Sequence, residues 1–176
     1  MVKERSKKDE KIYLKTKSYL EKNNDKEIES KMKIIDSILD IENKEERLSY
    51  LYDLICDYLD KEFSVNNICD FNCGICKRRQ AMIDAGIKKN TYQNGCCYSY
   101  MKERDCKYLS SDGKCQIKNI GCKLFTCHYL KKQGYKYKLN DIYLAKYFFN
   151  LRQKLYIENT IRVPKEEIIK GILERG

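Results

Sequence analysis

The chain has 176 residues, of which 42% are hydrophobic and 35% are charged, and its formal net charge is +10. This length fits one domain, or a compact core with a helical extension, and the hydrophobic content excludes a disordered tail. The first ten residues are basic but lack the apolar segment of a secretory signal, and no stretch approaches the roughly 18 apolar residues of a membrane span. We therefore expect a cytoplasmic protein that contacts no membrane.

Residues 1–68 are predicted to be helical, because they contain no Gly and no Pro. Apolar residues at helical spacing form one stripe over 28–39 and another over 48–59. Asn43, with a glutamate three residues later, indicates a helix start that separates the two stripes. The sequence therefore predicts a helical hairpin, preceded by a more exposed helix around residues 6–22.

Cys56 adjoins the apolar stripe of the second helix of this hairpin. A free cysteine in such a position usually behaves as a small hydrophobic residue. We expect Cys56 to lie in the core and not to bind a metal.

The other nine cysteines lie between residues 69 and 127. Cytosolic thiols stay reduced, so this density favours metal ligands over a disulfide framework, which is the alternative. The motif "CDFNCGIC" supplies three sulfurs within eight residues, and its glycine lets the backbone turn so that they converge on one centre. A short helix is predicted next, and "GCC" then brings two further cysteines. The candidate metal ligands are Cys69, Cys73, Cys76, Cys96, Cys97, Cys106, Cys115, Cys122 and Cys127.

Two four-cysteine centres account for eight of these nine ligands. The first takes the three cysteines of "CDFNCGIC" and one of Cys96 or Cys97, because adjacent side chains diverge. The second takes the last four cysteines of the region. An Asp-Gly turn signal between Cys106 and Cys115 predicts a short β-hairpin that would bring those two together.

The last two ligands lie in a stretch, "CKLFTCHYLKKQ", that is predicted to be a helix. Cys122 and Cys127 are five residues apart, which is about 140° around an ideal helix. They can share one metal only if Cys122 precedes the helix. If the helix starts earlier, they serve different centres.

The C-terminal part is again predicted to be helical. The stretch "LNDIYLAKYFFNLRQKLYIEN", residues 139–159, has a wide apolar surface that includes Leu151 and Leu155, as expected of one buried helix. A last helix is predicted to begin at Pro164, with two glutamates in its first turn.

The predicted fold is therefore mainly α. An N-terminal helical region, residues 1–68, and C-terminal helices, residues 136–176, flank an irregular cysteine-rich metal-binding module over 69–135 that contains the short β-hairpin. The C-terminal helices are expected to pack on the same core as the N-terminal ones.

Part of the cysteine region resembles the YkgJ-type family of zinc- or iron-chelating domains. That family joins a cysteine-dense first motif, which ends in a Cys pair, to a second motif "C-x-x-L … G-x-C-x-I … C-x-x-F". The residues that carry the resemblance are Cys106, Tyr108, Leu109, Gly113, Lys114, Cys115, Ile117, Cys122, Leu124, Phe125 and Cys127. The resemblance extends over residues 69–130 and implies metal chelation through these cysteines. The family includes flagellin lysine N-methylases, but no substrate or cofactor motif outside the cysteine region matches them.

The identity of the metal is open on spacing alone, because four-cysteine sites suit both zinc and iron–sulfur clusters. We expect two zinc ions, with a [4Fe–4S] cluster as the alternative. The spacing C-x3-C-x2-C also occurs in radical S-adenosylmethionine enzymes. Those enzymes need a large α/β barrel after the motif, whereas 100 residues follow Cys76 here.

Catalysis has little support in the sequence. His128 is the one histidine, and neither a P-loop nor a GxGxxG motif is present. We expect mainly structural metal centres, with an iron–sulfur or methyltransferase-related enzyme as an alternative.

The cysteine region is also basic. Residues 69–135 carry 13 Lys and Arg against 5 Asp and Glu, whereas residues 34–68 carry 3 against 9. Lysines and tyrosines interleave over 77–132, a pattern that can neutralise phosphates and stack on unpaired bases. Two zinc–tetrathiolate centres would carry about −2 each and offset part of the excess. The segment is expected to contact a protein partner or nucleic acid, and a merely solvated basic surface is the alternative.

Overall fold

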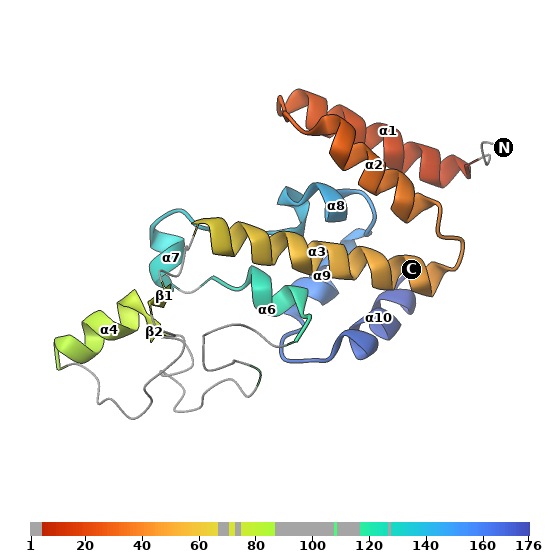
Figure 1. Ribbon diagram of the computed structural model, residues 1–176. Coiled ribbons are helices and arrows are strands. Elements are labelled where there is room, and N and C mark those ends of the chain that lie inside the picture. Colours follow the sequence, from red (N-terminus) through yellow and green to blue (C-terminus); the bar gives the residue numbers. More distant parts are fainter. Residues whose placement is uncertain (1–4, 67–70, 73–74, 87–107, 109–116, 127) are drawn as a thin grey trace.

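The computed structural model describes residues 5–66, 71–72, 75–86, 108, 117–126 and 128–176, and it is mainly helical (Figure 1). Within these residues no helix has the length and apolar character that crossing a bilayer requires. The helical content of the described residues confirms the predicted mainly α fold class. The predicted β-hairpin between Cys106 and Cys115 lies outside the described residues.

Three helices make up the N-terminal region, as predicted. Helices α1 (Lys7–Lys22) and α2 (Ile28–Leu39) pack against each other at one side of the long helix α3 (Lys44–Asn66). Asn43 begins α3, because its Oδ1 accepts hydrogen bonds from the backbone N–H groups of the second and third helical residues, at 2.9 and 3.0 Å. The predicted boundary near residue 43 is confirmed.

Helix α3 supplies the centre of the core. Leu51, Tyr52, Ile55 and Leu59 are fully buried, and α3 packs against helices from both sides of the cysteine region. Burying a large aliphatic side chain stabilises the fold by about 1.5–3 kcal/mol. Cys56 is also fully buried in this cluster, which confirms its prediction as a core residue.

The "CDFNCGIC" motif contains a short antiparallel pair of strands. Strand β1 (Phe71–Asn72) pairs with β2 (Ile75–Cys76), with Phe71 opposite Cys76. Helix α4 (Lys77–Asp84) follows directly and confirms the predicted short helix. The paired strands show that the chain reverses direction within the motif.

The helix predicted over "CKLFTCHYLKKQ" is wrong, because two short helices occupy this stretch. Helix α6 (Ile120–Leu124) ends before Phe125, which has an extended backbone with ψ of 119°, and α7 (His128–Lys132) begins three residues after Phe125. Phe and Thr have lower helix propensity than their Lys and Leu neighbours, and Thr126 is buried at the break. The 140° separation of an ideal helix therefore does not apply to Cys122 and Cys127.

The single helix predicted over 139–159 is also wrong. The stretch forms the 3-10 helix η1 (Leu139–Asp141) and helices α8 (Tyr143–Lys146) and α9 (Leu151–Asn159). Asn150 starts α9 with a capping box, in which Asn150 and Gln153 each accept a hydrogen bond from the other's backbone at 2.9 Å. This restart turns two leucines that were predicted to be buried towards solvent, Leu151 at 69% and Leu155 at 52% exposure.

The last helix, α10 (Lys165–Leu173), confirms the prediction from Pro164, which stands at the cap position immediately before it. One hydrophobic cluster joins residues of α1, α2 and α3 to residues of α6, α8, α9 and α10. The two flanks of the cysteine region therefore share a core.

Asn150→Ala is expected to lower the free energy of unfolding by about 1 kcal/mol, because it removes the side chain that caps α9. Urea unfolding followed by circular dichroism measures the change. Asn159→Ala, an exposed asparagine at the other end of the same helix, is the matched control and should change stability less. Equal effects of the two substitutions would contradict the helix restart at Asn150.

Candidate metal centre

Of the nine predicted ligands, Cys122 is the one whose side chain the structure describes. It lies in α6 and is half-buried. Cys76 lies in β2, where its backbone is described. Among the described residues, no three His, Cys, Asp or Glu side chains gather as a metal site would require. The ligands outside the described residues are Cys69, Cys73, Cys96, Cys97, Cys106, Cys115 and Cys127.

The backbone of Cys122 is fixed by Asn119, a fully buried polar residue that caps α6. Asn119 Oδ1 accepts a hydrogen bond from the Cys122 N–H at 2.7 Å, and its Nδ2 donates to the carbonyl of Val163 at 2.9 Å. One amide side chain therefore holds the start of α6 to the connection between α9 and α10.

Gly121 allows α6 to lie directly on the end of α9. A Cβ atom at this position would stand 2.5 Å from the carbonyl oxygen of Thr160 and 2.6 Å from that of Ile157. Both obstacles are backbone atoms, which cannot rotate away as a side chain would. The close approach of the two helices therefore requires glycine here.

The sulfur of Cys122 accepts a hydrogen bond from the backbone N–H of Arg162, with 3.1 Å between N and Sγ. Arg162 has a φ of 60°, in the left-handed region that few residues other than glycine adopt. Such strained positions cluster at functional sites. An N–H donor favours the anionic form of sulfur, which is the form that binds metals.

Tyr52 connects α6 to the centre of the core. Its hydroxyl oxygen accepts a hydrogen bond from the Ile120 N–H at 2.9 Å, and the ring is fully buried. Burial raises the pKa of Tyr52 well above its usual range, so the hydroxyl stays neutral. It therefore serves as a fixed hydrogen-bond partner for the first turn of α6.

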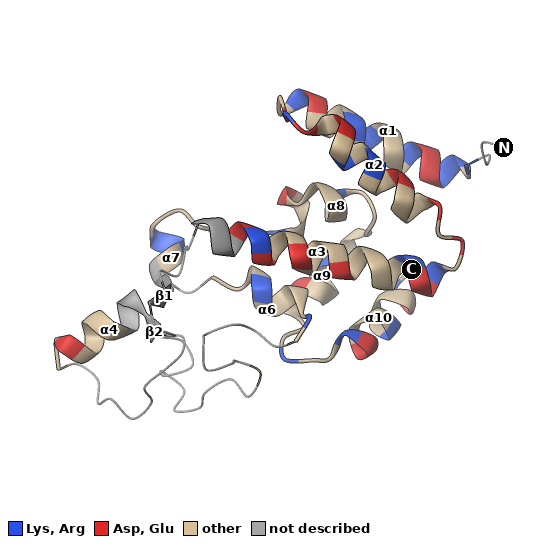
Figure 2. Cartoon of the chain, viewed as in Figure 1, with Lys and Arg blue, Asp and Glu red and all other residues tan. Residues whose placement is uncertain are grey.

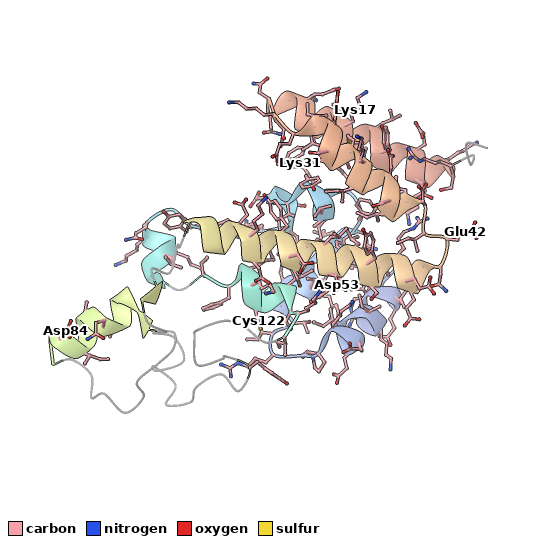
Figure 3. All side chains as sticks on the ribbon, in the orientation of Figure 1. Lys17, Lys31, Glu42, Asp53, Asp84 and Cys122 are labelled. Carbon is pink, nitrogen blue, oxygen red and sulfur yellow. The ribbon has the colours of Figure 1, made fainter. Side chains whose placement is uncertain are left out.

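Acidic residues of α3 face lysines that flank α6 (Figure 2). Asp53, labelled on α3 in Figure 3 together with Cys122 on α6, pairs with Lys165 at 2.9 Å and with Lys118 at 3.3 Å. Lys118 also lies 3.7 Å from Asp57. We call the carboxylates of Asp53, Asp57 and Asp60 together with their lysine partners the charged seam.

The charged seam continues to Asp60, which pairs with Lys123 of α6. The lysine side chain is 6% exposed, whereas the Asp60 side chain is 61% exposed. The acidic excess of residues 34–68 therefore partly neutralises the basic excess of the cysteine region.

Cys56 lies beneath this seam and differs from Cys122 in chemistry. Burial raises the pKa of the Cys56 thiol to about 12, an effect that nearby Lys123 opposes. At neutral pH the group is therefore a neutral thiol. This protonation state fits a core residue and not a metal ligand.

Three residues that build this site were not singled out by the sequence prediction, namely Asn119, Tyr52 and Arg162. The acidic side of the charged seam could have been found in the sequence, because Asp53, Asp57 and Asp60 recur at helical spacing. No feature of the sequence indicates the positive φ of Arg162.

Comparison of the chain with protein-family models, with curated proteins and with solved structures gives no match. The resemblance to the YkgJ-type family therefore remains a prediction from its motif residues.

Tyr52→Phe is expected to lower the free energy of unfolding by about 1–3 kcal/mol, because it leaves the buried Ile120 N–H without its acceptor. Hydrogen exchange of α6 should accelerate in the same variant. Tyr50→Phe, on the exposed side of α3, is the matched control and should change neither quantity. Unchanged α6 exchange in Tyr52→Phe would contradict this attachment of α6.

The Cys56 thiol should make stability fall at alkaline pH. Its contribution is fully present below the ordinary thiol pKa of 9.0 and is lost as pH rises towards the folded value of about 12, because the unfolded thiol ionises first. The slope for one group is at most about 1.4 kcal/mol per pH unit. Urea unfolding between roughly pH 8 and pH 11 should show a shallower decline in Cys56→Ala. Parallel curves would show that the two states of the chain ionise this thiol alike.

Proposed function

We propose that this protein is a cysteine-rich metal-binding protein whose centres are mainly structural, with zinc as the metal. The proposal extends to a basic surface that contacts a partner. The attachment of Cys122 is the observation that supports the metal-binding role best. Its sulfur accepts an N–H donor from a residue in the left-handed region, and its backbone is fixed by a buried asparagine.

A cysteine without a specific role does not require hydrogen bonds that fix both its backbone and its sulfur. Metal ligands are held in orientation by surrounding hydrogen bonds, and the loss of those bonds weakens metal binding. Here Asn119 and Arg162 supply hydrogen bonds of this kind. Cys56 differs from Cys122 in its surroundings. It is buried in an apolar cluster, and this burial raises the pKa of its thiol.

The break between α6 and α7 also favours a shared centre. Cys122 lies in α6, and α7 begins only at His128. The objection that a continuous helix would separate Cys122 from Cys127 is therefore removed. We assign these two, with Cys106 and Cys115, to one centre.

The other centre takes Cys69, Cys73 and Cys76 with one of Cys96 or Cys97. The pairing of β1 with β2 supports the assignment of the first three to one site, since it turns the chain back within their motif and sets Phe71 opposite Cys76. Zinc held by four thiolates has no open coordination position and serves to hold the chain together. The two centres would attach residues 69–127 to the helical core.

Native mass spectrometry is expected to find two zinc ions per chain, and Cys122→Ser is expected to lose one of them. The apparent free energy of binding structural zinc is on the order of 10–16 kcal/mol, so residues around the lost centre should also exchange hydrogen faster. Cys56→Ala is the matched control and should keep both ions, because that thiol lies in the core.

Full zinc content in Cys122→Ser would contradict the assignment of this ligand. Anaerobically purified protein that is brown, with iron in place of zinc, would replace the zinc proposal with an iron–sulfur cluster. Disulfides in freshly reduced protein would overturn metal binding altogether.

A further inference from the structure

A groove of about 390 Å³ lies on the surface formed by α6, the residues around α7 and η1, and the end of α9. Its apolar side includes Leu124, Phe125 and Ile161, and its basic side includes Lys131, Lys136 and Lys138. The volume is within the range of sites that enclose small organic ligands. We call it the lysine–aromatic groove.

The apolar side of the groove is partly exposed to solvent. Phe125 is 41% exposed and Ile161 is 44% exposed, and both line the same groove. Tyr135, in the same stretch of chain, is 39% exposed. Single exposed apolar residues are ordinary, whereas a group of them beside a polar rim is typical of binding surfaces.

The rim is basic. Residues 120–140 contain five lysines and no Asp or Glu. Two of the groove lysines, Lys136 and Lys138, flank Tyr137, and the third, Lys131, lies with its Nζ 5.9 Å from the centre of the Phe125 ring. The groove therefore holds cations beside an aromatic ring, the two kinds of group that bind the phosphates and bases of single strands.

Three lysines and one carboxylate line the groove, so the lining keeps a positive excess. The carboxylate is that of Glu158, whose Oε1 accepts a hydrogen bond from the Leu139 N–H at 2.9 Å. Glu62 lies near enough to Tyr137 to raise the pKa of its hydroxyl, after the larger effect of burial. Within the described part of the chain, no ion pair joins Glu158 to the three groove lysines, whereas the lysines of the charged seam are paired.

We propose that the lysine–aromatic groove binds single-stranded nucleic acid, with phosphates against Lys131, Lys136 and Lys138 and an unpaired base against Phe125. Proteins that bind single strands combine basic grooves with exposed aromatic rings in this manner. An acidic peptide would match the charge but would not need a flat aromatic face. The inference specifies the partner of the proposed basic surface and does not depend on the metal.

The probe is a fluorescent oligothymidine, titrated with the full-length protein and followed by anisotropy. Lys136→Glu with Lys138→Glu is expected to weaken binding and to reduce the slope of log affinity against log salt by about 1.4, since each neutralised phosphate of a single strand contributes about 0.7. Lys17→Glu with Lys22→Glu, two exposed positions on α1 (Lys17 is labelled in Figure 3), changes the net charge equally and should leave the slope nearly unchanged.

Phe125→Leu is expected to weaken binding by roughly 5- to 100-fold, the usual effect of losing one stacked base, whereas Phe125→Tyr should retain it. Leu151→Ala, at an exposed apolar residue of α9, is the control and should bind as the unmodified chain does.

Equal losses in the two lysine pairs, or equal affinity in the two Phe125 variants, would overturn the proposal. Binding of polyglutamate with no binding of oligothymidine at low salt would also overturn it and would indicate an acidic protein partner. Zinc content, measured on each variant, keeps the two proposals apart. A variant that keeps its zinc but no longer binds the oligonucleotide has lost the function of the groove and not the metal centres. Zinc-free protein that still binds the oligonucleotide would count against the metal proposal and not against the groove.

Discussion

The contact between α3 and α6 connects the cysteine region to the helical core, and its central element is the buried hydrogen bond from the Ile120 N–H to the Tyr52 hydroxyl. A buried amide that loses its acceptor costs about 1–3 kcal/mol. Exposed ion pairs are worth about 0–1 kcal/mol and weaken with salt. Lys118 is 48% exposed and Asp60 is 61% exposed, so the charged seam contributes less to the position of α6 than Tyr52 does.

Two kinds of constraint meet at Cys122. Gly121 fixes distance, because backbone atoms of α9 leave no room for a Cβ atom, and Asn119 fixes direction, because its two hydrogen bonds run to different segments. Together they leave α6 little freedom to shift along α9. The same packing leaves the Phe125 side of the chain exposed, since the helix ends one residue before it. The proposed metal ligand and part of the lining of the proposed binding groove therefore belong to the same short helix.

The sequence predicted the fold where local signals decide structure. The cap at Asn43, the start near Pro164 and the burial of Cys56 depend on a few neighbouring residues or on one apolar stripe. The apolar periodicity gave a wrong prediction of one helix over residues 139–159. The apolar spacing continues through Asn150, although a new helix begins after that residue. The surroundings of Cys122 were beyond such reasoning. The hydrogen bonds of Cys122, Asn119 and Ile120 reach residues that are 40, 44 and 68 positions away in the sequence, and no local pattern encodes such pairs.

These long sequence separations also mean that partner residues are synthesised at different times. Arg162 and Val163 follow Cys122 and Asn119 by about 40 residues, so the cysteine leaves the ribosome well before the segment that receives it. At about 5–20 residues per second, the delay is roughly 2–8 s. During that interval Tyr52 is already present, whereas the α9–α10 connection is not. For those seconds the Cys122 sulfur lacks the Arg162 N–H donor that it has in the folded chain.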